Sequence, residues 1–502
     1  MSRNWQMTLE ELVAGTGGRV LSQTERNFTG VGTDTRADLK GQIFIALKGD
    51  NFDAHDFLAK AVDAGAAALV VHRTPDAAVT NRVTVIQVDD TLSALQKLGR
   101  FWRRKMKARI LGVTGTNGKT TTKEFTAALL SSRFDVHWSK GSLNNHWGVP
   151  MSLLNMDPGH EIAVIEMGMN HLGELTELNK IAEPDVVMCT MVGRGHLAGL
   201  GSIEGVARAK TEIYEHAPES AMMIFNLENE HTRKMYERFA KERPAAKVLT
   251  FAGLQYAREQ GMLHQPQGAQ HRAPVTLESA TAWPELDVAL EVVSMEPESM
   301  HVRGEIQGVG GETTVAVFGR HNITNLMAAA AFGLSSGMTP AEIWKALPRC
   351  KTVWGRNQWV QLENGARVLF DGYNANPESM SAAVENFAAL KAPGRKFAVL
   401  GEMLEMGEHA SEVHRELGAK IAKSGVDGVC FFGASKVEFE AGLKSGGFQK
   451  TSFISDRYEH SLAPRMLPVL QVGDIVLMKG SRGMQLEKAL VDLKPVDFQA
   501  KK

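Results

Sequence analysis

Short apolar runs alternate with segments of helical periodicity along the middle of the chain. The apolar runs are Ile110–Val113, Ile162–Glu166, Val186–Met191 and Met222–Phe225. The helical segments between them are Thr120–Leu130, Leu172–Ile181 and Ile203–Tyr214. Runs that are apolar at every position are typical of strands buried on both faces. Their alternation with helices predicts a mostly parallel sheet covered by helices on both sides.

A smaller α/β pattern precedes this region. Strand-like runs at Gln42–Leu47 and Ala67–Val71 flank a helical stretch, Ala54–Gly65. A basic helix at 92–107 then leads to the first central strand, and we interpret its charges as a solvated face. We therefore expect a small N-terminal α/β domain at residues 1–107.

Two further patterns follow the central run. Alternating polar and apolar residues predict antiparallel strands appended to the sheet, at Val288–Val293, His301–Gln307 and Thr313–Val317. A third α/β alternation then begins, with strands at Val368–Phe370, Phe397–Leu400, Gly428–Phe432 and Ile475–Met478. We place domain boundaries near residues 108 and 338, so that the central domain covers 108–338 and the C-terminal domain 339–502. The Gln-, His- and Gly-rich region 257–273 is expected to be a surface excursion, and we assign it no chemistry.

Length and composition narrow the classes of protein. The 502 residues predict about three domains. The 56 Lys and Arg residues nearly balance the 57 Asp and Glu residues, so the whole molecule has no field that favours nucleic acid or an anionic membrane. Three widely spaced cysteines form neither a disulfide framework nor a zinc signature. No secretion signal and no apolar stretch of about 18 residues is found, so we expect a cytoplasmic protein without a membrane span.

A phosphate-binding loop is the strongest chemical signal. The run Gly112–Thr122 follows an apolar strand and precedes a helix, which is the context that such a loop requires. Its backbone N–H groups and helix N-terminus favour phosphate, Lys119 neutralises it, and the Thr120 hydroxyl can bind Mg²⁺. Val113 stands where the strict pattern has Gly, so the loop is a variant. The residues expected to contact ATP here are Thr114, Gly115, Thr116, Asn117, Gly118, Lys119, Thr120 and Thr121.

The loop alone leaves the reaction open, because kinases, GTPases, ATPases and ATP-dependent ligases share it. The central domain has no Asn-Lys-x-Asp segment that would read guanine, so ATP is favoured over GTP. Glu166 ends a buried strand and is expected to face the loop, since ligands gather at the carboxyl ends of parallel strands. From the residues alone, His196 reads as a loop or capping residue and Lys210 as an ordinary surface lysine.

The set of motifs, in order from Thr33 to Gly483, resembles the Mur ligases of peptidoglycan synthesis. The matching segments are Thr114-Gly-Thr-Asn-Gly-Lys-Thr120, Glu166 with Gly168-Met-Asn-His171, His196-Leu-x-Gly-Leu-Gly-Ser202, Ala209-Lys210-x-Glu212, Gly319-Arg-His-Asn322-x-x-Asn325 and Asp371-Gly-Tyr-Asn-Ala-Asn376-Pro377. The resemblance implies a three-domain fold: an N-terminal domain that binds a uridine nucleotide, a central P-loop ATPase domain and a Rossmann-like C-terminal domain that closes over the site.

The resemblance also implies the reaction and its partners. It implies ATP-dependent joining of D-alanyl-D-alanine to UDP-N-acetylmuramoyl-tripeptide through an acyl phosphate, with ADP released, by a monomer. The alternatives are a sister ligase that adds meso-diaminopimelate or lysine, a folylpolyglutamate synthase, and, in a different class, a P-loop kinase or ATPase switch. We find no C-terminal Asp-Asn-Pro-Arg signature of the diaminopimelate- or lysine-adding enzyme, which favours D-alanyl-D-alanine.

Site residues follow from the resemblance position by position. Two Mg²⁺ ions are expected, held by Thr120, Glu166, His196 and a carbamylated Lys210, and Lys119, Lys210 and His196 are the expected catalytic residues. The remaining ATP contacts are expected from His321, Asn322, Asn325, Arg356 and Asp371. The UDP-tripeptide and the dipeptide are expected to contact Thr33, Asp34, Thr35, Arg36, Asp53, His55, Asn144, Asn145, Asn170, Asn374 and Asn376.

Some features remain without a role at this stage. Gly401-Glu-Met-Leu-Glu-Met-Gly407, His414 and Lys479-Gly-Ser-Arg482 match the family, and structural support is as good an interpretation as substrate contact. Gly372 and the pair Arg194-Gly195 depart from the family pattern, and neither departure is at a position expected to bind a ligand.

Overall fold

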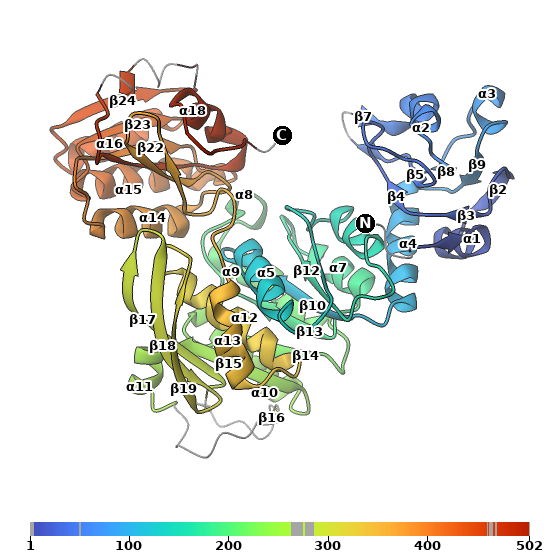
Figure 1. Cartoon of the computed structure of the whole chain (residues 1–502), viewed down its shortest axis with the longest axis horizontal. Helices are drawn as coiled ribbons and strands as arrows, with labels where there is room; N and C mark the ends of the chain where they lie inside the picture. The colour runs from blue at the N-terminus through green and yellow to red at the C-terminus, as the bar shows by residue number, and fades with distance from the viewer. Residues whose placement is uncertain are drawn as a thin grey trace.

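The chain folds into three units, each built around its own sheet (Figure 1). This computed structural model describes residues 5–49, 52–262, 275–276, 286–458, 460, 465–466 and 469–500. Most of the expected excursion at 257–273 lies outside the described residues; its first residues continue helix α11 (Leu254–Glu259). In the described part of the chain, no helix is both long and apolar enough to cross a lipid bilayer.

The N-terminal unit is a small α/β domain, as the pattern predicts. Its five-stranded sheet has the order β2 (Arg19–Ser22), β9 (Thr84–Gln87), β8 (Ala68–Val71), β5 (Ile43–Ile45) and β4 (Val31–Gly32). Short pairs form between β1 (Met7–Thr8) and β3 (Asn27–Phe28), and between β6 (Lys48–Gly49) and β7 (Phe52–Asp53). The helices are α1 (Leu9–Thr16), η1 (Ala54–Phe57), α2 (Leu58–Asp63), α3 (Ala77–Thr80) and α4 (Thr91–Lys105).

Helix α4 fastens this unit to the central one, and its charges are less solvated than the sequence predicts. Arg103 donates to the carbonyl oxygens of Ala182 and Glu183 and pairs with Asp185. Arg104 pairs with the Glu183 carboxylate. The basic face therefore docks on the acidic C-terminal end of helix α7 (Glu174–Ala182) rather than facing only water.

The central unit contains one long sheet with the predicted mostly parallel strands. Its order is β11 (Val136–Trp138), β12 (Ile162–Glu166), β10 (Arg109–Thr114), β13 (Val186–Cys189), β14 (Met222–Asn226), β15 (Lys247–Gly253), β17 (Val288–Glu296), β18 (Ser299–Ile306) and β19 (Val309–Val315). Strands β17, β18 and β19 pair antiparallel, as the alternating segments predict, and β16 (Val275–Thr276) pairs with β15.

Helices cover both faces of this sheet. They are α5 (Lys119–Leu130), α6 (Gly148–Leu154), α7 (Glu174–Ala182), α8 (Leu197–Leu200), α9 (Ile203–Glu215), α10 (Glu230–Glu242), α11, α12 (Asn322–Ser335), α13 (Pro340–Ala346) and η3 (Leu347–Arg349). Ile343, Leu347 and Cys350 pack in the same core as the buried residues of α5 and α12. The central core thus extends to Cys350, so that α13 and η3, which follow the boundary expected near 338, pack with the central unit.

The C-terminal unit is a second, mainly parallel sheet. Its order is β20 (Gln358–Gln361), β21 (Arg367–Asp371), β25 (Ile475–Lys479), β22 (Lys396–Gly401), β23 (Gly428–Phe432) and β24 (Thr451–Ser455), with only β20 antiparallel. Its helices are α14 (Pro377–Ala389), η4 (Gly407–His409), α15 (Ala410–Lys423), α16 (Lys436–Ser445), η5 (Arg482–Met484) and α18 (Leu486–Asp492). Strands β20 and β24 are absent from the sequence-based prediction, since both are short edge strands.

Candidate active site

The phosphate loop joins β10 to α5 and needs glycine at two positions. Gly115 has φ +147°, and a Cβ there would lie 1.9 Å from Thr190 Oγ1. Gly118 has φ +84°, and its Cβ would lie 2.4 Å from Asn325 Oδ1. Val113, which departs from the strict pattern, is a buried residue of β10, so it lies in the strand rather than in the loop. The departure therefore leaves the loop itself intact.

Lys119 opens helix α5 and lies over the loop. Its Nζ donates to the carbonyl oxygen of Gly115 at 2.7 Å. Burial lowers the pKa of Lys119, while the Glu166 carboxylate acts in the opposite direction. A lysine that is only partly satisfied by a carbonyl oxygen is positioned to exchange this bond for a phosphate oxygen.

Glu166 lies at the end of β12, and the structure brings it to Thr120 as expected. The Thr120 hydroxyl donates to Glu166 Oε1 at 3.2 Å, and Asn144 Nδ2 donates to the same oxygen at 2.8 Å. Lys123 Nζ lies 3.5 Å from the other oxygen, Oε2. Among the described residues no group hydrogen bonds to Oε2, although Glu166 is only 1 % exposed.

Lys123 is a site residue that the sequence analysis missed. It is fully buried on α5, one turn after Thr120, and also donates to the Gly141 carbonyl oxygen at 2.9 Å. The available signal was its position three residues after Thr120, the threonine expected to bind Mg²⁺, because residues at i and i+3 share a helix face. Lys123 and Asn144 together hold the Glu166 carboxylate in place.

Lys210 is not a surface residue. It lies on α9 with no exposed area, and within the described part of the chain its Nζ has no hydrogen-bond partner. Burial, together with the charge of Lys119, lowers the pKa of Lys210 to about 7. A fraction of the amine is therefore neutral and nucleophilic at physiological pH.

His196 meets the C-terminal unit. It lies just before α8 with φ +59°, and its Nδ1 is 2.9 Å from Glu405 Oε2 without hydrogen-bond alignment. Burial lowers the pKa of His196. The nearby imidazole of His196 in turn lowers the pKa of the Glu405 carboxyl. Glu405 belongs to the 401–407 segment, which the sequence analysis left without a role.

Arg356 reaches the phosphate loop from the C-terminal unit. Its Nη2 donates to Thr120 Oγ1 at 3.4 Å, and its guanidinium lies 4.2 Å from the centre of the Tyr373 ring. Asp371, at the end of β21, is buried and pairs with Lys479 at 2.5 Å. Asp371, one of the expected ATP contacts, is thus engaged through Oδ2 with Lys479, and its Oδ1 accepts from the Asn357 N–H at 3.4 Å. Gly372, a departure from the family pattern, lies so close to the Phe370 ring that a Cβ would be 2.6 Å away.

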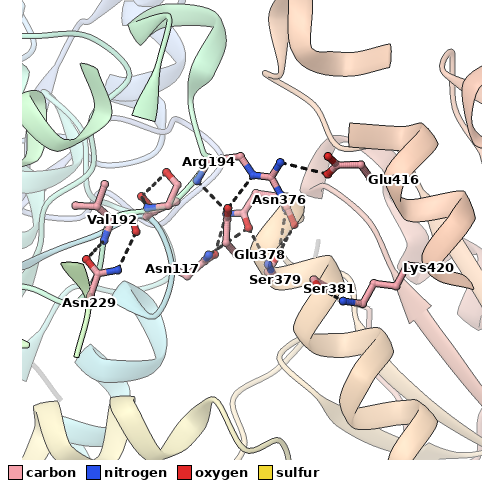
Figure 2. A network of polar contacts seen from close by, with 12 residues as sticks. Asn117, Val192, Arg194, Asn229, Asn376, Glu378, Ser379, Ser381, Glu416 and Lys420 are labelled. Carbon is pink, nitrogen blue, oxygen red and sulfur yellow. Dashed lines mark hydrogen bonds and ion pairs between the residues drawn. The ribbon is translucent and has the colours of Figure 1, made fainter. Parts of the chain in front are cut away.

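Polar contacts join the central and C-terminal units near the loop (Figure 2). Asn117 and Asn376 exchange two amide hydrogen bonds. Arg194 donates through its backbone N–H and its Nε to Glu378, and through Nη1 to Glu416. The unusual Arg194 is therefore an interface residue.

Three of the expected ATP contacts, His321, Asn322 and Asn325, already form hydrogen bonds or close polar contacts within the chain. Asn322 Nδ2 donates to the Phe318 carbonyl oxygen at 2.7 Å, and Asn325 Nδ2 donates to Asn322 Oδ1 at 2.8 Å. Asn325 Oδ1 accepts from Thr122 Oγ1 and lies against Gly118. Asn325 thus braces the phosphate loop. His321 lies between the side-chain amides of Asn357 and Asn386, at 3.1 and 3.3 Å.

The residues expected to hold the uridine nucleotide lie in the N-terminal unit, away from this cluster (Figure 1). Asp34 and Arg36 form a bidentate pair on an exposed loop, and hydrogen bonds from Arg36 lower the pKa of Asp34 to about 2. Thr33 and Thr35 are partly exposed beside them.

Asp53 and His55 form a second pair in this unit. Asp53 Oδ1 lies 2.8 Å from His55 Nδ1, and the His72 N–H donates to His55 Nε2 at 3.1 Å. The carboxyl of Asp53 and the rings of His55 and His72 are close enough to suggest a metal site. Both ring nitrogens of His55 are engaged and its side chain has no exposed area, so His55 orients Asp53 rather than reaching a ligand.

A cavity of about 320 Å³ is lined by side chains of both the central and the C-terminal unit. Its described lining residues all belong to these two units and include Asn117, Lys119, Thr120, Asn144, Asn145, Glu166, Asn170, His196, Arg356, Asn374 and Glu405. Asn145 Oδ1 accepts from the Gly148 N–H, and the Asn170 N–H donates to Glu174. One group of the sequence-predicted residues therefore lines this cavity and another lies in the N-terminal unit. Lys210, His321, Asn322, Asn325 and Asp371 are not among the described lining residues of the cavity.

Comparison with known protein families covers most of the chain. Residues 27–103 match the Mur ligase family catalytic domain, 113–333 the Mur ligase middle domain, and 355–482 the Mur ligase glutamate ligase domain. The UDP-N-acetylmuramoyl-tripeptide–D-alanyl-D-alanine ligase of Bacillus subtilis is 34% identical over 469 residues, which are 92% of this chain and 93% of that protein.

Solved structures give the same result. MurF from Acinetobacter baumannii superposes with a TM-score of 0.81 at 27% identity, covering 97% of this chain and 98% of that one. MurF ligase from Thermotoga maritima in complex with ADP has a TM-score of 0.72 at 28% identity, covering 92% and 96%. The similarity extends through all three units rather than being confined to the phosphate loop.

Proposed function

Because this chain belongs to the Mur ligase family, we propose that it joins D-alanyl-D-alanine to UDP-N-acetylmuramoyl-tripeptide with conversion of ATP to ADP and phosphate. The observation that carries the proposal is the similarity of this chain, over nearly its whole length, to UDP-N-acetylmuramoyl-tripeptide–D-alanyl-D-alanine ligases. The site supports it independently, because one cavity holds a phosphate loop, a buried carboxylate and groups from a second unit that reach across it.

The first step is phosphorylation of the tripeptide carboxylate. An oxygen of that carboxylate attacks the γ-phosphorus of ATP, the bond to the β-γ bridging oxygen breaks, and ADP leaves with an acyl phosphate formed. The two reactants are both anionic, so the reaction needs fixed positive charge at the point of attack. Lys119 and Arg356 supply it from the two units that face each other across Thr120.

The residues present fit a magnesium ion. Thr120 and Glu166 present adjacent oxygen atoms, and Glu166 Oε2 is buried without a hydrogen bond, which a cation would satisfy. Bound Mg²⁺ would screen the phosphate charges during transfer. Asn144 and Lys123 orient the carboxylate that holds it.

We assign Lys210 as a carbamylated residue that, with His196, holds a second Mg²⁺. Its neutral amine would attack CO₂, forming an N–C bond and releasing one proton. The product replaces a buried cation by an anion with two oxygen atoms, which are the ligands that Mg²⁺ prefers. The support is that Nζ is wholly buried, has no partner within the described residues and has its pKa lowered to about 7.

The second step forms the amide. The dipeptide amine attacks the acyl carbon, the bond to the phosphate oxygen breaks, and inorganic phosphate and one proton leave. Water would destroy the acyl phosphate, so the cavity must stay closed between the steps. The contacts of Asn117 with Asn376 and of Arg194 with Glu378 hold the C-terminal unit over the loop.

We assign the uridine nucleotide to the N-terminal unit, at Thr33, Asp34, Thr35, Arg36 and Asp53, with His55 as the support of Asp53. Asn322, Asn325, His321 and Asp371 are assigned to the adenosine end of ATP. We further propose that the enzyme acts as a monomer in the cytoplasm, where both nucleotides are present.

The test is a phosphate-release assay in which each substrate is omitted in turn. Continued turnover to ADP and phosphate should require the UDP-tripeptide and D-alanyl-D-alanine together, and the product should be the UDP-pentapeptide. Turnover with meso-diaminopimelate or lysine on a UDP-dipeptide would indicate a sister ligase, and turnover with a folate and glutamate would indicate a folylpolyglutamate synthase. A phosphorylated product without an amide, or turnover without an acceptor, would indicate a kinase or an ATPase switch.

A further inference from the structure

Residues 495–500 follow the last helix of the C-terminal unit and are tied to the edge of its sheet. The Val496 N–H donates to the carbonyl oxygen of Gln361, the last residue of β20, at 2.9 Å. Pro495 pairs with Leu362 as an antiparallel bridge. Because β20 is an edge strand, its outer side is free to receive this segment. None of the assignments above uses these residues.

The Phe498 side chain of this segment belongs to a cluster of three aromatic rings. Its ring centre lies 6.1 Å from that of Trp354, with the two rings nearly parallel, and 5.2 Å from that of Phe370, edge to face. Trp354 and Phe370 also meet edge to face, at 5.8 Å. The Trp354 Nε1–H donates to the Gln499 carbonyl oxygen at 3.1 Å. Segment 495–500 therefore holds the Trp354 ring both by packing and through its N–H group.

Trp354 lies at the tip of a turn that ends at Arg356. The Arg356 N–H donates to the Val353 carbonyl oxygen at 3.0 Å, which closes the turn. Gly355, the other residue at the tip, has φ +68°, a conformation that favours glycine. The Tyr373 N–H donates to the Gly355 carbonyl oxygen at 3.2 Å. Since Gly355 has no side chain, Trp354 is the side chain through which packing can hold the tip of the turn.

The turn carries the Arg356 guanidinium to the phosphate loop, where few contacts hold it. Its hydrogen bond to Thr120 Oγ1 is long, at 3.4 Å, and its Nε is buried with no hydrogen-bond partner among the described residues. The remaining printed contact is with the face of the Tyr373 ring, at 4.2 Å. The position of the guanidinium therefore depends on the backbone that carries it. A displacement of about 1 Å in such a group is enough to slow a reaction.

We propose that Phe498 is a positioning residue for phosphoryl transfer, which acts through Trp354 to hold the Arg356 guanidinium in place over the phosphate loop. The assignment rests on the proposed function, in which Arg356 stabilises the charge of the transferred phosphoryl group. The loop and Lys119 bind the triphosphate from the central unit, so ATP binding needs Phe498 little. A misplaced guanidinium should therefore lower kcat more than it raises KM for ATP.

The first arm of the test compares two aromatic deletions in the whole enzyme. Phe498→Ala should lower kcat about tenfold and change KM for ATP less than about twofold, whereas Phe498→Tyr keeps the ring and should keep most of the wild-type kcat. Phe453→Ala is the matched control. Phe453 packs edge to face on Phe432 in the same core, but it lies on β24 at the opposite edge of the sheet. This control should lower the melting temperature and leave kcat unchanged.

The second arm tests whether Phe498 acts through Arg356. Arg356→Lys keeps a positive charge without the planar guanidinium, and it should lower kcat by itself. Adding Phe498→Ala to Arg356→Lys should lower kcat by less than about a further twofold, because the group that Phe498 positions is already gone. A further tenfold loss would show that Phe498 acts through another group, such as Arg482, whose guanidinium lies 5.5 Å from the Trp354 ring. That result would overturn the assignment.

Amide hydrogen exchange gives a readout that does not depend on the reaction. Phe498→Ala should speed exchange of the Arg356 N–H, which closes the turn, and Phe453→Ala should not. A wild-type enzyme without turnover that requires both acceptor substrates contradicts the proposed function, and the positioning role with it. Turnover by the wild type with an equal kcat in Phe498→Ala, or with unchanged exchange of the Arg356 N–H, overturns the positioning role alone.

Discussion

Asn117 in the phosphate loop and Asn376 at the start of α14 exchange amide hydrogen bonds, at 3.2 Å from Asn117 Nδ2 and 2.8 Å from Asn376 Nδ2. Asn376 also caps α14, because its Oδ1 accepts from the Ser379 N–H. One side chain thus begins a helix of the C-terminal unit and contacts the loop that binds phosphate. We therefore predict that ATP binding and the docking of the C-terminal unit are linked through this pair.

Replacing Asn376 by Ala should reduce stability and weaken ATP binding together. The lost cap costs about 1 kcal/mol, and the lost contact should raise KM for ATP several-fold. Thr339→Ala is the matched control, because Thr339 caps α13 with a complete capping box away from the loop. It should lower the melting temperature without changing KM for ATP. Equal values of KM in the two variants would contradict the link.

Removing Asn144 should raise the Mg²⁺ requirement. Asn144→Ala deletes the donor 2.8 Å from Glu166 Oε1, and loss of such a supporting contact costs about 10- to 100-fold in metal affinity. The measurement is the Mg²⁺ concentration that gives half-maximal ADP release. Asn145→Ala removes a contact to the Gly148 N–H instead and should leave that concentration near the wild-type value. The support role is wrong if both variants behave alike.

Replacing Lys210 by Ala should lower the rate of ligation about 100-fold or more. Short-chain carboxylates should restore part of the activity, because they supply the oxygen atoms of the missing carbamate. With ¹³C-labelled bicarbonate, a carbamate carbon signal should appear in the wild type and be missing in the variant. Arg208→Ala, on the exposed face of the same helix, should keep both activity and signal. Full activity of the Lys210 variant excludes the carbamate.

The protein should become less stable in mild acid because of the buried side chain of His137. Burial, with a smaller effect of His160, lowers the pKa of His137 from 6.5 to about 4. Between these values the unfolded chain binds the proton and the folded one does not, so the free energy of unfolding falls as the pH drops from 6.5 to 4. The full loss is about 3 kcal/mol.

The check is the urea midpoint at both ends of that range. His137→Gln should flatten the dependence, whereas His171→Gln, which changes an exposed histidine paired with Glu174, should retain it. An equally steep dependence in His137→Gln would show that other groups cause it.

Much of the fold follows from local pattern. The fully apolar runs predicted strands β10, β12, β13 and β14, and the polar alternation predicted β17, β18 and β19, because burial on two faces or on one dictates those patterns. Short edge strands such as β20 and β24 carry a weaker pattern. Helix α13 packs in the core of the central unit, and nothing in its own sequence indicates which core it joins.

The sequence by itself determined the phosphate loop, the acid at the end of β12 and the family resemblance, since each depends on neighbouring residues or on motif order. Only the tertiary structure decided that Lys210 is buried, that Lys123 and Asn144 support Glu166, and that Glu405 and Arg482 share a cavity. Burial and pairing between residues far apart in the chain depend on how sheets and helices pack. A lysine in a helical segment can be exposed or buried, and the sequence pattern does not distinguish the two before that packing is known.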